Sequence, residues 1–273
     1  MPISDHAPPV SAEILARSDG ATIAYRRRAA AGAGASLPGI LFLGGFASDM
    51  NGTKATALDG FCADRGQAFV RFDYMGHGQS SGRFEDGTIG RWTEDALAVL
   101  DALTDGPQIL VGSSMGGWVM LNVALVRPFR VAALVGIAAA PDFTEDIWTG
   151  MDDRQRGRLL AEGRIFLPSE YGAAPYPITR GLIEDGRHHL RLSGSMPISC
   201  PVRLLHGMRD TDVPWRKSLA IAERLEAQDV QLTLIKDGDH RLSRDQDLDL
   251  LLRTVGRLSG TLRAPGDSPD DAA

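Results

Sequence analysis

A serine flanked by glycines lies near the middle of the chain. Residues 112–116 read Gly-Ser-Ser-Met-Gly; they follow the apolar run 108–111 and precede helical periodicity that begins at Trp118. In a strand-turn-helix segment, glycines two residues either side of a serine let the neighbouring backbone approach without Cβ clashes. The helix N-terminus also favours a developing negative charge. The pattern predicts Ser114 as a nucleophile; the alternative is a turn that caps a helix.

A serine nucleophile needs a general base. In the known arrangement that places a Gly-x-Ser-x-Gly serine between a strand and a helix, the acid and then the histidine follow the serine in the chain. His188 and His189 are adjacent and are expected to face solvent, and His206 ends a strand, where it is expected to shape the following turn. His240 lies in a polar loop after the last predicted strand, from which it can reach Ser114 without breaking a ladder. We predict His240 as the base.

The acid is expected just after the penultimate strand, predicted at 201–206. Asp210 follows the strand exit closely, whereas Asp212 is placed to cap a helix that is expected to begin near Pro214. We predict that Asp210 orients the imidazole, with Asp212 as the alternative. A turn and N-cap pair would explain both aspartates without catalysis. Asp142, after the preceding strand, is a third candidate for the acid.

Backbone N–H groups are expected to bind an oxyanion beside the serine. The predicted strand at 39–43 ends in two glycines, and the N–H of Phe46, which follows them, is expected to join that of Met115. The turn at 73–80 follows the next strand. We expect it to be a structural turn beside the site, and His77 within it comes too early in the chain to be the base.

Short β-rich runs alternate with segments of helical period along most of the chain. Because most of the runs are apolar throughout, they indicate strands that are covered on both faces. The pattern predicts a mostly parallel eight-stranded sheet that opens with an antiparallel hairpin and carries helices on both faces. The predicted strands are 10–17, 22–27, 39–43, 68–72, 107–111, 131–138, 201–206 and 230–236.

The alternation is interrupted once. From 142 to 199 no strand is predicted, and we expect this insertion to form a cap over the site. The chain is therefore expected to be a single domain over 10–262 with an inserted cap. The segments 1–9 and 263–273 are expected to be flexible tails.

Charge and composition limit the partners. Lys and Arg total 29 against 35 Asp and Glu, a net charge of −6, and no long basic run occurs, so nucleic acid is not an expected partner. The longest apolar stretches are about half of the ~20 residues that a membrane span needs. Cys62 and Cys200 fit no metal-ligand spacing. The first residues lack basic and apolar targeting regions, which predicts a cytoplasmic location.

Several further motifs accompany the predicted triad: residues 50–55 (Met-Asn-Gly-Thr-Lys-Ala), 71–74 (Arg-Phe-Asp-Tyr), 105–114, 206–210 (His-Gly-Met-Arg-Asp) and 239–241. With these motifs the chain resembles the α/β-hydrolase family over roughly residues 38–260, and within it the mitochondrial palmitoyl-protein thioesterases that also act as acyl-glucuronide esterases. The resemblance implies the α/β-hydrolase fold, with the family's triad on Ser114, Asp210 and His240.

The expected activity is that of a serine hydrolase that cleaves carboxylic esters or acyl thioesters through an acyl-enzyme, without a metal or organic cofactor. Its substrate is expected to be a small-molecule acyl ester or thioester, or an S-acylated protein. Because the 142–199 segment matches the family least, small esters and lipidated cysteines both stay open. A C–C bond or peroxy-acid hydrolase and a non-catalytic hydrolase-like binding protein are the alternative functions.

Overall fold

The sheet has eight strands. In the computed structural model, which describes residues 12–168 and 175–262, the strand order is β1-β2-β4-β3-β5-β6-β9-β10. The first strands pair antiparallel with their neighbours, and the pairs from β4 to β10 are parallel. The predicted fold class is therefore confirmed. The strands are β1 (Glu13–Ala16), β2 (Thr22–Arg28), β3 (Gly39–Leu43), β4 (Phe69–Phe72), β5 (Gln108–Ser113), β6 (Val131–Ile137), β9 (Val202–Gly207) and β10 (Val230–Ile235).

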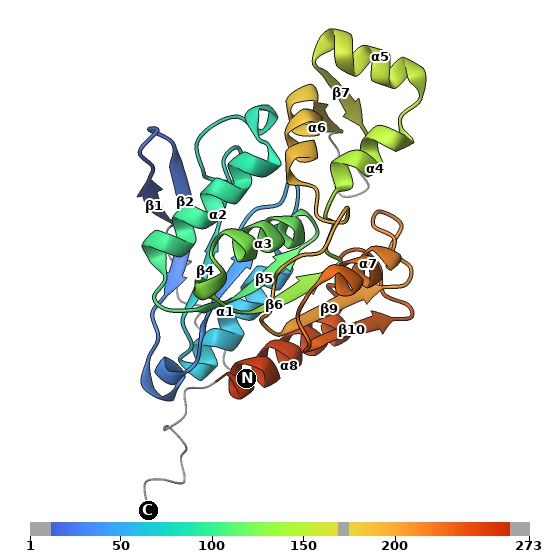
Figure 1. The fold of residues 1–273 in the computed structure, drawn as a ribbon. Helices are drawn as coiled ribbons and strands as arrows, with labels where there is room; N and C mark the ends of the chain where they lie inside the picture. Colours follow the sequence, from blue (N-terminus) through green and yellow to red (C-terminus); the bar gives the residue numbers. More distant parts are fainter. Residues whose placement is uncertain (1–11, 169–174, 263–273) are drawn as a thin grey trace, which may run out of the picture.

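Helices cover both faces of this sheet (Figure 1). On one face, α1 (Thr53–Arg65) and α8 (Asp245–Thr261) pack their apolar residues against the strands. On the other face lie α2 (Ile89–Leu103), α3 (Met115–Val126) and α7 (Arg216–Arg224). The described residues also form short 3₁₀ turns at Gly32–Ser36, Phe84–Asp86, Pro128–Arg130 and Arg187–His189. No helix in the described ranges is long and apolar enough to span a membrane.

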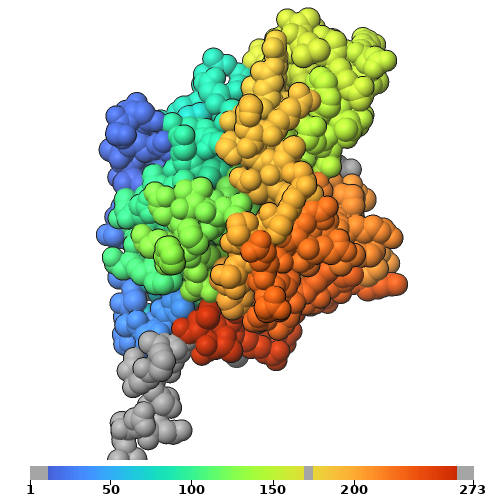
Figure 2. Space-filling view, viewed as in Figure 1, coloured from blue at the N-terminus to red at the C-terminus, as the bar shows by residue number. Residues whose placement is uncertain are grey.

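Residues 142–199, which we call the cap segment, lie between β6 and β9. They contain α4 (Phe143–Gly150), α5 (Asp153–Glu162), β7 (Arg164–Leu167), β8 (Tyr176–Thr179) and α6 (Arg180–Gly186). Most of the segment projects beyond the sheet (Figures 1 and 2). The expectation that it holds no strand is wrong, because β7 and β8 form an antiparallel pair. Each strand has only four residues, which is too short to show a clear strand pattern in the sequence. In β8, Pro177 also disfavours the prediction of a strand.

Polar contacts tie the two ends of the cap segment together and attach the segment to α2. The Asp142 carboxylate, at the start of the segment, accepts hydrogen bonds from the backbone N–H groups of Arg191 and Leu192 near its end, each at 2.8 Å. The N–H of Gly90, in the first turn of α2, donates to Asp185 of α6 at 2.8 Å. The segment is thus closed by its own contacts and bonded to the rest of the fold through α6. The predicted tails at 1–9 and 263–273 lie outside the described residues.

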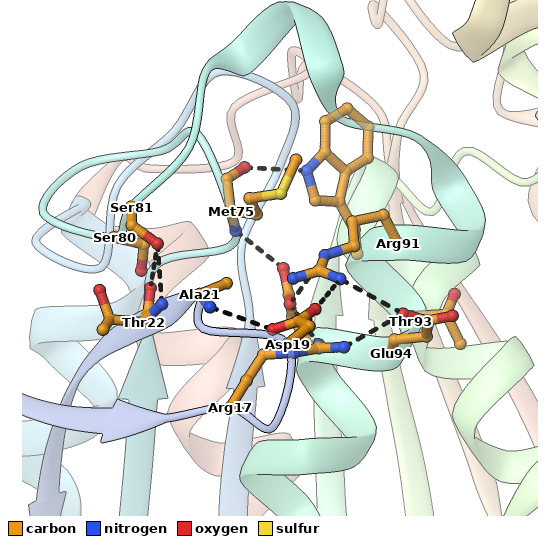
Figure 3. A network of polar contacts seen from close by, with 12 residues as sticks. Arg17, Asp19, Ala21, Thr22, Met75, Ser80, Ser81, Arg91, Thr93 and Glu94 are labelled. Atoms are coloured by element: carbon orange, nitrogen blue, oxygen red, sulfur yellow. Dashed lines mark hydrogen bonds and ion pairs between the residues drawn. The ribbon is translucent and has the colours of Figure 1, made fainter.

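A polar network holds the loop that follows β4 (Figure 3). Arg17 donates to the buried carboxylate of Asp95 at 2.6 Å, and the second oxygen of Asp95 accepts the N–H of Met75 at 2.8 Å. The indole N–H of Trp92 donates to the carbonyl of Met75 at 3.1 Å. Because these partners belong to α2 and to the end of β1, the loop at 73–81 has a fixed position at the carboxyl edge of the sheet.

The turn between β5 and α3 depends on its glycines. A Cβ on Gly116 would lie 2.1 Å from the carbonyl oxygen of Leu43, and one on Gly112 would lie 2.5 Å from the carbonyl oxygen of Gly116. Ser114 has φ +52°, a conformation that non-glycine residues rarely adopt. The backbone therefore approaches β3 closely while it turns sharply at Ser114, as the Gly-x-Ser-x-Gly pattern predicts.

This close approach predicts that Gly116→Ala destabilises the fold. Since the added methyl group meets backbone and not a flexible side chain, we expect a loss of about 1–3 kcal/mol in the free energy of unfolding, measured by urea titration. Gly60→Ala is the matched control. Nothing lies within 4 Å of a Cβ at Gly60, which is in helix α1, so it should leave stability unchanged or raise it by up to about 1 kcal/mol. Equal stability of the two variants would contradict the steric account.

Candidate active site

Three side chains from three strand exits form a continuous line of hydrogen bonds. His240 Nε2 lies 3.0 Å from Ser114 Oγ, and His240 Nδ1 lies 2.8 Å from Asp210 Oδ2. Ser114 follows β5, His240 follows β10 and Asp210 follows β9. The carboxyl ends of these strands share one edge of the sheet. Because Nδ1 faces a carboxylate, it holds the ring proton, and Nε2 is left as the acceptor for the serine hydroxyl. The arrangement can take a proton from Ser114.

Asp210 is the most completely bonded group of the site. Its side chain has no solvent exposure. Oδ1 accepts the backbone N–H groups of Asp212 (2.9 Å) and Val213 (2.8 Å), and Oδ2 is shared by His240 and by His206 Nε2 at 3.1 Å. Burial alone would raise the pKa of this carboxyl, but the hydrogen bonds from His206, His240 and Val213 outweigh it and hold the pKa well below its usual range. Asp210 is therefore ionised at neutral pH.

The other two candidate acids lie elsewhere in relation to the imidazole. Asp212 is exposed, and its carboxylate is within 4.8 Å of the ring and of Asp210, but the short contact to His240 Nδ1 belongs to Asp210. The expected helix cap at Asp212 is wrong, because α7 has Trp215 at its N-cap and no side-chain cap. Asp142 binds the cap segment's own backbone, as described above.

The loop that carries Phe46 lies against the serine turn. A Cβ on Gly45 would lie 3.6 Å from the Cβ of Ser114, so the two backbones nearly touch. Phe46 and Met115, the two predicted oxyanion donors, follow Gly45 and Ser114 directly in the chain. Both N–H groups therefore come from segments that meet at the same edge of the sheet.

His77 contacts the loop that carries Phe46 and Ala47. Its side chain is buried; Nδ1 lies 3.1 Å from the carbonyl oxygen of Met75, and Nε2 accepts the N–H of Ala47 at 3.2 Å. Burial lowers the pKa of His77, which favours the neutral ring that can accept at Nε2. Ala47 has φ +55° and follows Phe46 directly. The network of Figure 3 thus reaches the predicted oxyanion loop through Met75 and His77.

The loop of His240 is held from two sides. Lys54, in the first turn of α1, donates from Nζ to the carbonyl of Arg241, and burial lowers the pKa of Lys54 to about 8. A Cβ on Gly207, the last residue of β9, would lie 2.3 Å from the carbonyl oxygen of Gly238. The backbone on both sides of His240 is therefore fixed.

Aromatic rings surround the side chain of Phe46. Phe84 and Trp92 contact it from the sheet domain, with ring centroids 4.8 and 5.9 Å away. Phe143 and Tyr176 contact it from the cap segment, at 5.7 and 5.6 Å. The residue next to the serine turn therefore joins the cap segment to the domain through an apolar, edge-to-face cluster.

Sequence reasoning missed two supporting residues, Lys54 and the second histidine on Asp210. No local signal in the sequence connects Lys54 to residue 241, because the contact spans 187 positions. His206 did carry a signal, since it is a polar residue at the end of an apolar strand and four positions before Asp210. His188 is exposed as expected, whereas His189 is partly buried, with Nε2 3.7 Å from Asp185 of α6.

Known proteins resemble this chain over most of its length. A family model described as the alpha/beta hydrolase fold matches residues 38–167. The mouse protein named palmitoyl-protein thioesterase ABHD10, mitochondrial, is 43% identical over 249 residues, which cover 91% of this chain and 82% of the relative. Its human counterpart is 41% identical, covering 91% and 80%.

These relatives correct one prediction. The cytoplasmic location expected from the first residues is contradicted, because the relatives at 41–44% identity are named as mitochondrial. The prediction rested on the composition of a short terminal segment alone, whereas the relatives match about nine tenths of the chain.

Solved structures agree with the sequence relatives. The structure of mouse alpha/beta hydrolase domain-containing protein 10 has a TM-score of 0.85 at 42% identity, covering 93% of this chain and all of that chain. Est1E from Butyrivibrio proteoclasticus, at 21% identity and a TM-score of 0.75, covers 90% of this chain and 97% of that chain and shares the fold. The predicted resemblance is thereby confirmed, and the chain belongs to the α/β-hydrolase family, in the group that contains the ABHD10 proteins.

Proposed function

We propose that this protein is a serine hydrolase that cleaves carboxylic esters or acyl thioesters through an acyl-enzyme. The observation that carries the proposal is the unbroken line from Ser114 Oγ through the imidazole of His240 to Asp210, with contacts of 3.0 and 2.8 Å. Relatives named palmitoyl-protein thioesterase, more than 40% identical over nine tenths of the chain, support the thioesterase and esterase class.

In the first half of the reaction, Ser114 Oγ attacks the carbonyl carbon while its proton passes to His240 Nε2. Asp210 stabilises the resulting imidazolium through the hydrogen bond at Nδ1. The N–H groups of Phe46 and Met115 bind the oxyanion. The imidazolium then donates its proton to the leaving oxygen or sulfur, and the carbon–heteroatom bond breaks to leave an ester on Ser114.

In the second half, water replaces the leaving group. His240 Nε2 takes one proton from the water as its oxygen attacks the acyl-enzyme, and the proton is returned to Ser114 Oγ when the acid departs. The serine, the neutral imidazole and the carboxylate are thus restored. The proposed cycle uses no metal or organic cofactor.

The aromatic cluster around Phe46 is the proposed wall of the acyl site. It is apolar, it adjoins the serine turn, and two of its rings, Phe143 and Tyr176, come from the cap segment. We therefore assign residues 142–199 the role of a cap that covers the acyl chain. Each methylene buried there would contribute about 0.8 kcal/mol to binding.

The nucleophile is tested with a fluorophosphonate probe. We expect covalent labelling of the wild type and of Ser113→Ala, and loss of labelling in Ser114→Ala, because the hydroxyl of Ser114 lies 3.0 Å from His240 Nε2. Intact-mass spectrometry measures the adduct. Undiminished labelling of Ser114→Ala, or a wild type that neither binds the probe nor cleaves p-nitrophenyl acetate or butyrate, would overturn the proposal.

The acid is tested by exchanging each aspartate for asparagine. Asp210→Asn removes the anion that selects the tautomer of His240, so we expect kcat on p-nitrophenyl butyrate to fall by roughly 10³–10⁴-fold. Asp212→Asn is the matched control; its carboxylate is exposed, and we expect kcat within about threefold of the wild type. A larger loss in Asp212→Asn than in Asp210→Asn would transfer the role to Asp212.

A further inference from the structure

A second histidine contacts the proposed catalytic acid. His206, at the exit of β9, has no solvent exposure, and each ring nitrogen has a polar partner. Nε2 lies 3.1 Å from Asp210 Oδ2 and 2.9 Å from the carbonyl oxygen of Val213, and Nδ1 lies 2.6 Å from Ser218 Oγ of α7. The proposed reaction cycle assigns no role to His206.

These partners determine which nitrogen of His206 carries the proton. A carboxylate oxygen and a carbonyl oxygen can only accept, so Nε2 must be the donor to Asp210 and Val213. The hydroxyl of Ser218 can both donate and accept, so it suits Nδ1 with or without a proton. Nε2 of His206 therefore carries a proton that is directed at the acid.

We propose that His206 is a positioning residue that fixes Oδ2 of Asp210 for its contact with His240, an inference that rests on the proposed triad. Oδ1 of Asp210 is held by two backbone N–H groups, whereas the donors that contact Oδ2 are the two imidazoles. His240 lies on a loop and changes its protonation during the cycle. His206 lies on β9, which is paired with β6 on one side and β10 on the other, and it takes no part in the proposed proton transfers, so it holds Oδ2 at a constant position.

The same hydrogen bond spreads the charge of the carboxylate. When its donor is removed, Asp210 attracts a proton on His240 more strongly, so the base stays protonated to a higher pH. Other charged groups on or near the His240 loop include Asp212, within 4.8 Å of the ring, the chain neighbours Asp239 and Arg241, and Lys54, which binds the carbonyl of Arg241. All four are unchanged when His206 is replaced, so a shift of the pH profile reports the His206 contact.

The test compares His206→Leu with His206→Gln. Leucine fills the site without a donor, and we expect kcat on p-nitrophenyl butyrate to fall about 10–100-fold with KM within about threefold of the wild type. The acid limb of kcat/KM should move to higher pH. Glutamine carries an N–H at a similar reach, so it should recover kcat to within a few-fold and restore the wild-type acid limb. Thermal unfolding measures the folded fraction of each variant.

A merely structural role would lower the amount of active protein without moving the acid limb. A folded His206→Leu with the rate and pH profile of the wild type would therefore overturn the inference, as would a folded His206→Gln that is as impaired as His206→Leu. If His206→Leu does not fold, His206→Gln decides, because the inference requires near wild-type kcat and an unmoved acid limb. These outcomes need an active wild type; an inactive wild type overturns the proposed function itself, and the inference with it.

Discussion

A buried carboxylate with four hydrogen-bond donors is the interaction on which the candidate site depends. An isolated charge in the position of Asp210 would be costly, and the cost is offset because backbone N–H groups and two imidazoles satisfy both oxygens. Three of these donors come from β9 and the loop that follows it. The fourth donor, His240, is thereby directed toward Ser114. The geometry of the Ser114–His240–Asp210 line therefore depends on the conformation of the loop after β9.

The parallel sheet explains how such distant residues meet. Strand exits at β3, β4, β5, β9 and β10 lie along one edge, and each exit is held by contacts from elsewhere in the chain. Asp73, for example, accepts the N–H of Met50 at 2.6 Å and that of Gln79 at 2.8 Å, which joins the loops after β3 and β4. Lys54 does the same for the His240 loop. Polar contacts with one another and with the start of α1 therefore hold the loops of the site in place.

The sequence carried much of this arrangement, because local patterns specify local geometry. The Gly-x-Ser-x-Gly turn at Ser114 is a local steric requirement, and the positions of the strands of the main sheet follow from apolar runs that alternate with helical segments, so both could be predicted. Asp210 and Asp212 could be ranked but not separated, since two residues in one turn differ only in the direction of their side chains. The pairing of β7 with β8 and the contact of Lys54 with the His240 loop depend on tertiary packing, which has no local signature.

The central claim is that acyl groups pass through an ester on Ser114. The most direct measurement is rapid acid quench of the enzyme during turnover of a long-chain acyl thioester, followed by intact-mass and peptide mass spectrometry. The account predicts a transient mass increase equal to the acyl group less one hydrogen, located on the peptide that contains Ser114 and absent in Ser114→Ala. Turnover with the adduct on another residue, or undiminished turnover by Ser114→Ala, would contradict it.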